Sequence, residues 1–135
     1  MNGSDYSSTP LAKKLGIKEG TLILGYHLPD DYPEKLNPLP AGVRLTQEAS
    51  TSDFIHLFIR SRLELEEILP DFKAALNQEG MLWINWPKAA SGILCDINRE
   101  GVRELGPKQG LVDVKVASFD STWSGLKFVY RVKDR

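Results

Sequence analysis

Basic side chains follow two apolar runs of the sequence. Arg60 and Arg62 come directly after residues 54–59, and Lys88 follows residues 81–86. If both runs are parallel strands, the three cations reach the same edge of a sheet. Arginine forks suit a phosphate or a carboxylate, and a lysine adds a point charge. The sequence therefore predicts an anion site at that edge. The alternative is that the side chains point into solvent and pair with neighbouring carboxylates, which contributes little.

Small residues follow Lys88 in a predicted loop. Ser91 and Gly92 close this loop, and loop amides together with a lysine can hold an anion. The alternative is a solvated lysine on a tight connection. Trp123 lies among polar residues in another predicted turn, where it either lines a site or caps the end of the sheet.

His27 directly follows the first apolar run, residues 21–26. Histidine titrates near pH 6.5 and can act as a general base. The sequence near it shows no evident nucleophile or carboxylate partner, so a loop histidine is favoured. His56 lies within a buried run and is expected in the core. The two histidines and Cys95 fall in different elements and give no metal-ligand spacing, so we expect no metal site.

The composition is that of a soluble globular protein. The 135 residues are 41% hydrophobic and 26% charged, which fits one domain. We expect a flexible tail over residues 1–8 and a single α/β domain over residues 9–135. A net charge of −1 argues against nucleic-acid or membrane partners. One cysteine, no apolar leader and no apolar run of membrane length predict a cytoplasmic protein.

Residues 53–88 predict a strand, a helix and a second strand, and the rest of the fold is expected to assemble around this unit. Apolar residues recur at helical spacing from Leu65 to Leu76, and Gly80 is expected to end the helix. Pro70 interrupts the pattern and predicts a kink or a restart. A helical crossover of this kind joins parallel strands. Three acidic residues are expected on the solvated face of the helix: Glu64, Glu66 and Glu67.

The flanking segments extend this unit. Thr9 and Pro10 predict the start of a short helix that stops at Gly16, and Asp96 predicts the N-cap of a helix that closes near Gly106. The short connection 120–125 makes the last two strands antiparallel. The predicted fold class is therefore α/β: a single Rossmann-like, mostly parallel sheet with an antiparallel C-terminal hairpin strand and helices on both faces. Further strands are expected at residues 21–26, 43–46 (near an edge), 111–119 and 126–132, with one helical turn at 32–36.

Three segments carry a resemblance to a known family. TPLAKKLGIKEG, WPKAASG and DSTWSGLKFVYR together resemble a family of small bacterial proteins catalogued as a domain of unknown function. The segment ALNQEGMLWINWPK and the C-terminal hairpin resemble the later part of a class I methyltransferase fold, in truncated form. The resemblance spans nearly the whole chain. The resemblance implies a methyltransferase-like fold, and it gives no information about activity.

The chain departs from that fold where a methyltransferase binds its cofactor. A glycine-rich turn follows the first strand in such folds, because glycine lets the backbone approach the cofactor closely. Here the turn reads Gly25-Tyr26-His27-Leu28-Pro29, and Ile59-Arg60-Ser61-Arg62 replaces the usual motif after the fourth strand. One strand-helix pair is also predicted to be absent. We therefore expect no adenosylmethionine binding and no cofactor.

Three functions follow from these predictions. The first is a non-catalytic methyltransferase-like module that binds a small anionic ligand or a protein partner. The second is a small enzyme of another class that uses the strand carboxyl ends through Lys88, His27 or Asp120. The third is an active methyltransferase, which ranks last. Because one fold supports many functions, the choice among them depends on the site.

Overall fold

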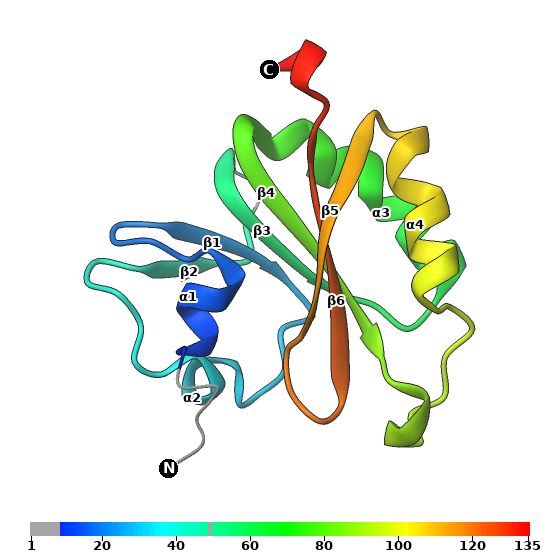
Figure 1. Ribbon diagram of the computed structural model, residues 1–135, viewed down its shortest axis with the longest axis horizontal. Coiled ribbons are helices and arrows are strands. Elements are labelled where there is room, and N and C mark those ends of the chain that lie inside the picture. The colour runs from blue at the N-terminus through cyan, green and yellow to red at the C-terminus, as the bar shows by residue number, and fades with distance from the viewer. Residues whose placement is uncertain (1–8, 49) are drawn as a thin grey trace.

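A six-stranded sheet runs through the residues that the computed structural model describes, 9–48 and 50–135 (Figure 1). The predicted tail, residues 1–8, lies outside the described residues. The strand order is β2-β1-β3-β4-β6-β5, which places β2 at one edge and β5 at the other. The strands are β1 (Leu22–Tyr26), β2 (Arg44–Thr46), β3 (Ser52–Phe58), β4 (Leu76–Pro87), β5 (Leu111–Ser118) and β6 (Trp123–Tyr130).

The strand directions agree with those expected from the sequence. Strands β2, β1, β3 and β4 pair in parallel, and β6 is antiparallel to both β4 and β5. Strand β5 therefore runs in the same direction as the first four strands. The predicted mixed sheet, parallel except for one hairpin strand, is confirmed.

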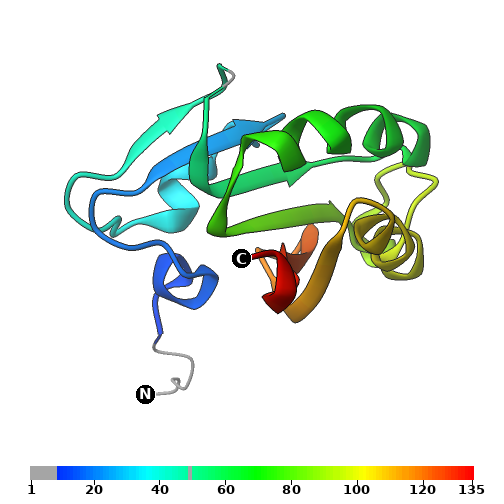
Figure 2. The same ribbon diagram turned by 90° about the horizontal axis from the view of Figure 1, so that it is seen from above.

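Helices cover both faces of the sheet, as predicted. On one face, α3 (Arg62–Ala75) and α4 (Arg99–Lys108) enclose a core that includes Leu57 and Ile84. On the other face, α1 (Leu11–Leu15) and α2 (Tyr32–Leu36) enclose a second core. Figure 2 shows α1 and α3 on opposite sides of the strands. Among the residues that the structure describes, 3₁₀ turns are also found at Ala89–Ser91 and Val132–Asp134.

Gly80 was predicted to end the central helix, and this prediction is wrong. Helix α3 ends at Ala75, and Gly80 is buried within β4. A Cβ on Gly80 would lie 2.9 Å from the carbonyl oxygen of Asp53 on the neighbouring strand. The pairing of β3 with β4 is irregular between Ser52 and Phe54. Glycine is therefore required here by the close approach of two backbones, not by a helix cap.

Pro70 does not make the helix restart, because α3 is continuous from Arg62 to Ala75 with Pro70 inside it. A proline in a helix removes the hydrogen bond to the carbonyl four residues earlier. That carbonyl belongs to Glu66, and both Pro70 and Glu66 are exposed. Water can therefore replace the lost partner, which lowers the cost of the proline.

Two predicted helix caps lie at neighbouring residues instead. Asn98, and not Asp96, caps α4: its side chain accepts a hydrogen bond from the backbone N–H of Gly101 at 3.1 Å. The Asp96 carboxylate instead accepts from the backbone N–H of Arg62 at 2.7 Å, in the first turn of α3. At α1, Pro10 stands at the cap position in place of Thr9, and the helix ends at Gly16 as predicted.

Three polar side chains are buried together where α2 meets β3 and β4. The Tyr32 hydroxyl lies 2.8 Å from Nδ1 of His56, and His56 Nε2 lies 3.0 Å from Oδ1 of Asn85. Since the amide oxygen can only accept, His56 carries its proton on Nε2 and accepts from Tyr32 through Nδ1. Burial lowers the pKa of His56 to about 3. The prediction that His56 belongs to the core is confirmed, because its side chain is fully buried.

The buried imidazole predicts a dependence of stability on pH. The folded pKa of His56 lies below the ordinary value of 6.5, so the unfolded chain binds a proton that the folded chain does not. The free energy of unfolding contributed by His56 is therefore fully present above pH 6.5 and is lost as the pH falls. Between pH 6 and pH 5 the loss should be about 1 kcal/mol, measured by urea unfolding.

The matched variants are His56→Gln and His27→Gln. Glutamine replaces the imidazole by a polar amide that does not titrate, so His56→Gln should flatten the fall between pH 6 and pH 5. His27 is exposed, and its substitution should leave the fall in place. A His56→Gln protein with the same pH dependence as the parent would show that His56 is not its source.

Candidate functional site

A pocket opens beyond the carboxyl ends of β1 and β3. From β1 the chain continues to β2 on one side of it, while β3 lies on the other side, so the strand order switches at this point. Ligands in open α/β sheets bind at such switch points. The cavity has a volume of about 380 Å³. We call it the rim pocket, and it is lined by His27, Leu28, Phe58, Arg60, Glu64, Ile93 and Trp123.

One wall of the rim pocket is formed by His27 and Glu64, and Tyr26 contacts both of them. The Tyr26 hydroxyl donates a short hydrogen bond to Oε2 of Glu64, and Nδ1 of His27 lies 3.6 Å from the same oxygen. The rings of Tyr26 and His27 stack with centroids 4.0 Å apart. Burial, together with Glu64, raises the pKa of Tyr26 to about 12. Tyr26 therefore stays protonated at neutral pH and holds the carboxylate beside His27.

Glu64 is a site residue that the sequence analysis placed on the solvated face of the helix. It lies in the first turn of α3, whose N-cap is Ser61; the Ser61 side chain accepts from the Glu64 backbone N–H at 3.2 Å. This cap starts the helix directly beyond β3 and turns Glu64 toward the end of β1. A capping serine shortly after a buried strand was the signal that could have placed Glu64 at the site.

The opposite wall of the rim pocket is aromatic and cationic. Phe58 and Trp123 meet edge to face, with centroids 5.1 Å apart and planes at 87°. Trp123 is the first residue of β6, not part of the turn as predicted. Arg60 is exposed, and among residues 9–48 and 50–135 no carboxylate lies within ion-pair distance of it. This wall offers the partly buried ring of Trp123 and an arginine fork to a ligand.

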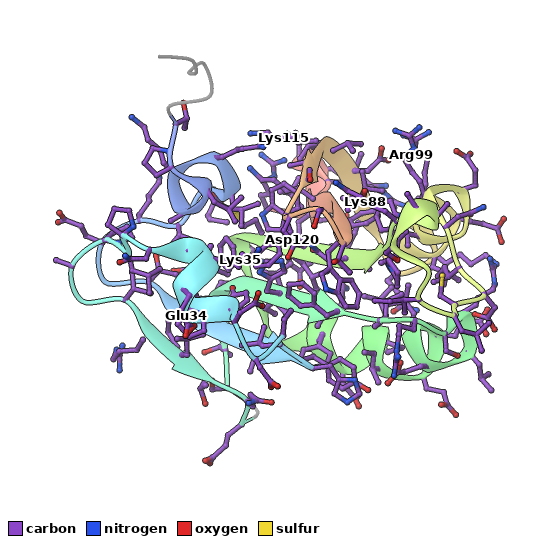
Figure 3. All side chains as sticks on the ribbon, turned by 90° about the horizontal axis from the view of Figure 1, so that it is seen from below. Glu34, Lys35, Lys88, Arg99, Lys115 and Asp120 are labelled. Atoms are coloured by element: carbon purple, nitrogen blue, oxygen red, sulfur yellow. The ribbon has the colours of Figure 1, made fainter. Side chains whose placement is uncertain are left out.

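The other two predicted cations line a second, larger cleft of about 980 Å³, between the end of β4 and the start of α4. Arg62 pairs with Glu66 at 3.3 Å and makes a short hydrogen bond to Glu104. This contact raises the pKa of Arg62 and lowers that of Glu104. Lys88 donates from Nζ to the Ser118 hydroxyl at 2.7 Å, toward the hairpin (Figure 3).

The three cations that were predicted to converge therefore lie in two separate cavities. Arg60 lies in the rim pocket with His27 and Trp123, whereas Arg62 and Lys88 lie in the larger cleft. For Arg62 the structure matches the alternative interpretation, in which carboxylates on the protein itself take up the charge. The lining of the rim pocket also includes Glu64, a carboxylate that the predicted site did not contain.

Ser91 and Gly92 shape the loop beyond Lys88 and line neither cavity. The Ser91 hydroxyl donates to the carbonyl of Lys88 at 2.7 Å and accepts from the backbone N–H of Ile93 at 3.2 Å. Gly92 follows the 3₁₀ turn with a φ of 77°, in the left-handed region that favours glycine. In this structure both residues have a local role in the turn.

Within the described ranges 9–48 and 50–135, no three His, Cys, Asp or Glu side chains are grouped so that they could hold a metal ion. In the same ranges, no helix is both long enough and apolar enough to cross a membrane.

Comparison with known proteins identifies the class of fold. A methyltransferase from Aquifex aeolicus that depends on SAM superposes with a TM-score of 0.60 at 14% identity, over 87% of this chain and 86% of that one. The SAM-bound magnesium protoporphyrin IX methyltransferase of Synechocystis superposes with a TM-score of 0.59 at 6% identity, over 90% and 74% of the two chains. A ribosomal protein L11 methylase from Lactobacillus delbrueckii gives 0.56 at 12% identity, over 96% and 81%.

These superpositions show a methyltransferase-like α/β fold, as the sequence predicted. At such low identities the likeness concerns the fold alone. No family model matches the chain, and no curated protein matches it in sequence. The narrower resemblance to a bacterial family of unknown function therefore stays a prediction.

A leucine side chain lies over the glycine of the turn after β1. Leu28 folds back onto Gly25, so closely that a Cβ built on Gly25 would lie 2.5 Å from the Leu28 side chain. The space that a glycine turn leaves open in such folds is thus filled by a leucine. The same leucine packs against the core around Phe58 and Trp83.

We therefore expect adenosylmethionine to fail as a tight ligand. A working cofactor site of micromolar affinity corresponds to about 8 kcal/mol of binding free energy. Titration calorimetry should show no saturation at micromolar adenosylmethionine. Clear saturation in that range would contradict the prediction and would favour an active methyltransferase.

Proposed function

We propose that this chain is a non-catalytic methyltransferase-like module that binds a small anionic ligand in the rim pocket. The ligand class is a carboxylate or phosphate attached to a flat, apolar group. The observation that carries the proposal is Arg60, which brings a cation without a carboxylate partner among the described residues to a pocket with an aromatic wall.

The position of the pocket supports this proposal. It lies at the switch point of the strand order, where the sheet leaves room for a ligand between two diverging connections. The guanidinium of Arg60 can form two parallel hydrogen bonds to a carboxylate or phosphate. The ring of Trp123, which is only partly buried and is backed by Phe58, provides the apolar surface against which a flat group packs. Glu64 is held by Tyr26 and His27 and so repels the anion less than an unpaired carboxylate would.

An enzyme of another class is the second candidate, and one observation favours it. His27 lies beside the Glu64 carboxylate, and a histidine oriented by a carboxylate is the usual arrangement of a general base. The residues that line the rim pocket include no serine, threonine or cysteine. A histidine base in this pocket would have to activate water or a substrate group. Binding is favoured because it requires nothing beyond the groups present.

The proposal predicts that benzoate and phenyl phosphate bind and that benzamide, the neutral analogue of benzoate, does not. Binding can be followed by the shift of the Trp123 indole N–H signal in ¹⁵N-resolved NMR spectra. Arg60→Gln should weaken benzoate binding by about 1 kcal/mol or more, roughly fivefold, because an arginine–carboxylate contact is lost.

Arg62→Gln is the matched control, because it removes the same charge from a side chain already paired with Glu66 and Glu104. This variant should bind benzoate as the parent does. If Arg60→Gln also binds like the parent, or if benzamide binds as well as benzoate, the rim pocket is not an anion site. Turnover of a phenyl ester that is abolished in His27→Gln would favour the enzyme instead.

A further inference from the structure

Lysines from three separate elements approach one another on the face of the sheet that carries α1. Lys115 on β5 stands directly opposite Lys127 on β6 in the antiparallel pairing. Lys18 follows α1 and lies near enough to Lys127 for its charge, like that of Lys115, to lower the Lys127 pKa. We call Lys18, Lys115 and Lys127 the lysine cluster. It contains none of the residues that line the rim pocket.

The fold holds this cluster in place. Nζ of Lys115 donates to the carbonyl of Lys14 at 3.0 Å, near the end of α1. Figure 3 shows Lys115 on the hairpin beside that helix. The indole N–H of Trp83, the residue paired with Lys127 on its other side, donates to the carbonyl of Leu15 at 2.9 Å. The end of α1 is therefore anchored to both the hairpin and β4.

The lysine cluster carries an electrostatic cost that no ion pair among residues 9–48 and 50–135 offsets. Like charges directly opposite each other on antiparallel strands are destabilising. Lys127 is partly buried, and its pKa is lowered by that burial and then by the charges of Lys115 and Lys18. Within residues 9–48 and 50–135, no carboxylate lies within ion-pair distance of the three lysines. A bound anion would remove this cost.

We propose that the lysine cluster binds a compact ligand that carries several phosphates, such as a polyphosphate chain or the triphosphate of a nucleotide. Lysine ammonium groups act as point charges and suit phosphate without demanding one fixed geometry. A ligand with several charges is expected because Lys115 and Lys127 stand opposite each other and Lys18 lies near Lys127.

The surroundings of the cluster favour a compact ligand over a nucleic acid. Lys18 also lines a cavity of about 320 Å³ whose other walls carry three carboxylates: Glu19, Asp53 and Glu79. These groups lie beside the cluster and would repel an extended polyanion. The net charge of −1 likewise gives no broad basic surface of the kind that nucleic-acid binding requires.

The test is titration calorimetry of the full chain with inorganic tripolyphosphate, adenosine triphosphate, and inorganic phosphate at matched ionic strength. Tripolyphosphate should bind at least about tenfold more tightly than phosphate, because it meets all three lysines. Adenosine triphosphate binding as tightly as tripolyphosphate identifies the phosphate chain as the recognised group. Tighter nucleotide binding shows that the base adds contacts to the same site.

Two cluster variants and one control make the test specific. Lys115→Gln combined with Lys127→Gln should weaken tripolyphosphate binding at least about tenfold, whereas Lys115→Arg combined with Lys127→Arg should retain it. Lys108→Gln removes a lysine from α4, a helix on the opposite face, and should change binding less than about twofold. Lys127→Gln should also raise the melting temperature of the ligand-free protein, because it relieves the repulsion from Lys115. A melting curve for each variant confirms that it is folded.

Three results would overturn the proposal. The first is no heat of binding with tripolyphosphate at low salt. The second is an equal loss of affinity in the cluster variants and in Lys108→Gln, which would indicate diffuse attraction. The third is tighter binding of a single-stranded RNA than of tripolyphosphate at equal phosphate concentration. None of these results would bear on the rim pocket, whose test uses benzoate, benzamide and Arg60.

Discussion

The parallel pairing of β3 with strands on both sides is the constraint on which the rest of the structure depends. In this register Tyr26 stands beside Leu57, and Phe58 stands beside Asn85. The three strands therefore end at nearly the same level, and the residues that follow them meet at one edge. Strand β3 is buried from Phe54 to its end, because both cores pack against it. The two faces of the sheet are therefore coupled through this strand.

The polar side chain in the middle of this strand, His56, has a hydrogen-bond partner for each of its ring nitrogens. His56 is bonded on one side by Tyr32 from α2 and on the other by Asn85 from β4. A buried polar group without a partner would cost about 1–3 kcal/mol. Both partners must therefore be in place, so the contact fixes the short helix α2 against the sheet. These hydrogen bonds position α2 on the sheet as well as stabilising the fold, because α2 buries few other large side chains.

The sequence was sufficient to predict features that depend on neighbouring residues. It failed to predict contacts between residues that are far apart in the chain. Apolar runs and a short hairpin connection set the strand directions. Gly80 was misread because a glycine that ends a helix and a glycine that allows two strands to approach look alike in one dimension. The contact of Tyr26 with Glu64 spans 38 residues, and that of Arg62 with Glu104 spans 42. No periodicity or motif predicts such pairs, so the sequence could not show that the cations lie in two cavities.

The turn after β1 combines a side chain of the core with a residue of the rim pocket. Leu28 occupies the space above Gly25, so the turn now contributes to the core and the polar groups lie farther out. His27 adopts a φ of 53°, a left-handed conformation that costs a residue with a side chain roughly 1–2 kcal/mol. Such strain persists where surrounding contacts hold it, and it is concentrated at functional sites. Here the contacts that hold His27 are Tyr26, whose ring stacks on it, and Glu64, which lines the same pocket. The strain, the hydrogen-bonded carboxylate and the switch point of the sheet therefore coincide at one place, and this coincidence favours the rim pocket over the larger cleft as the site of function.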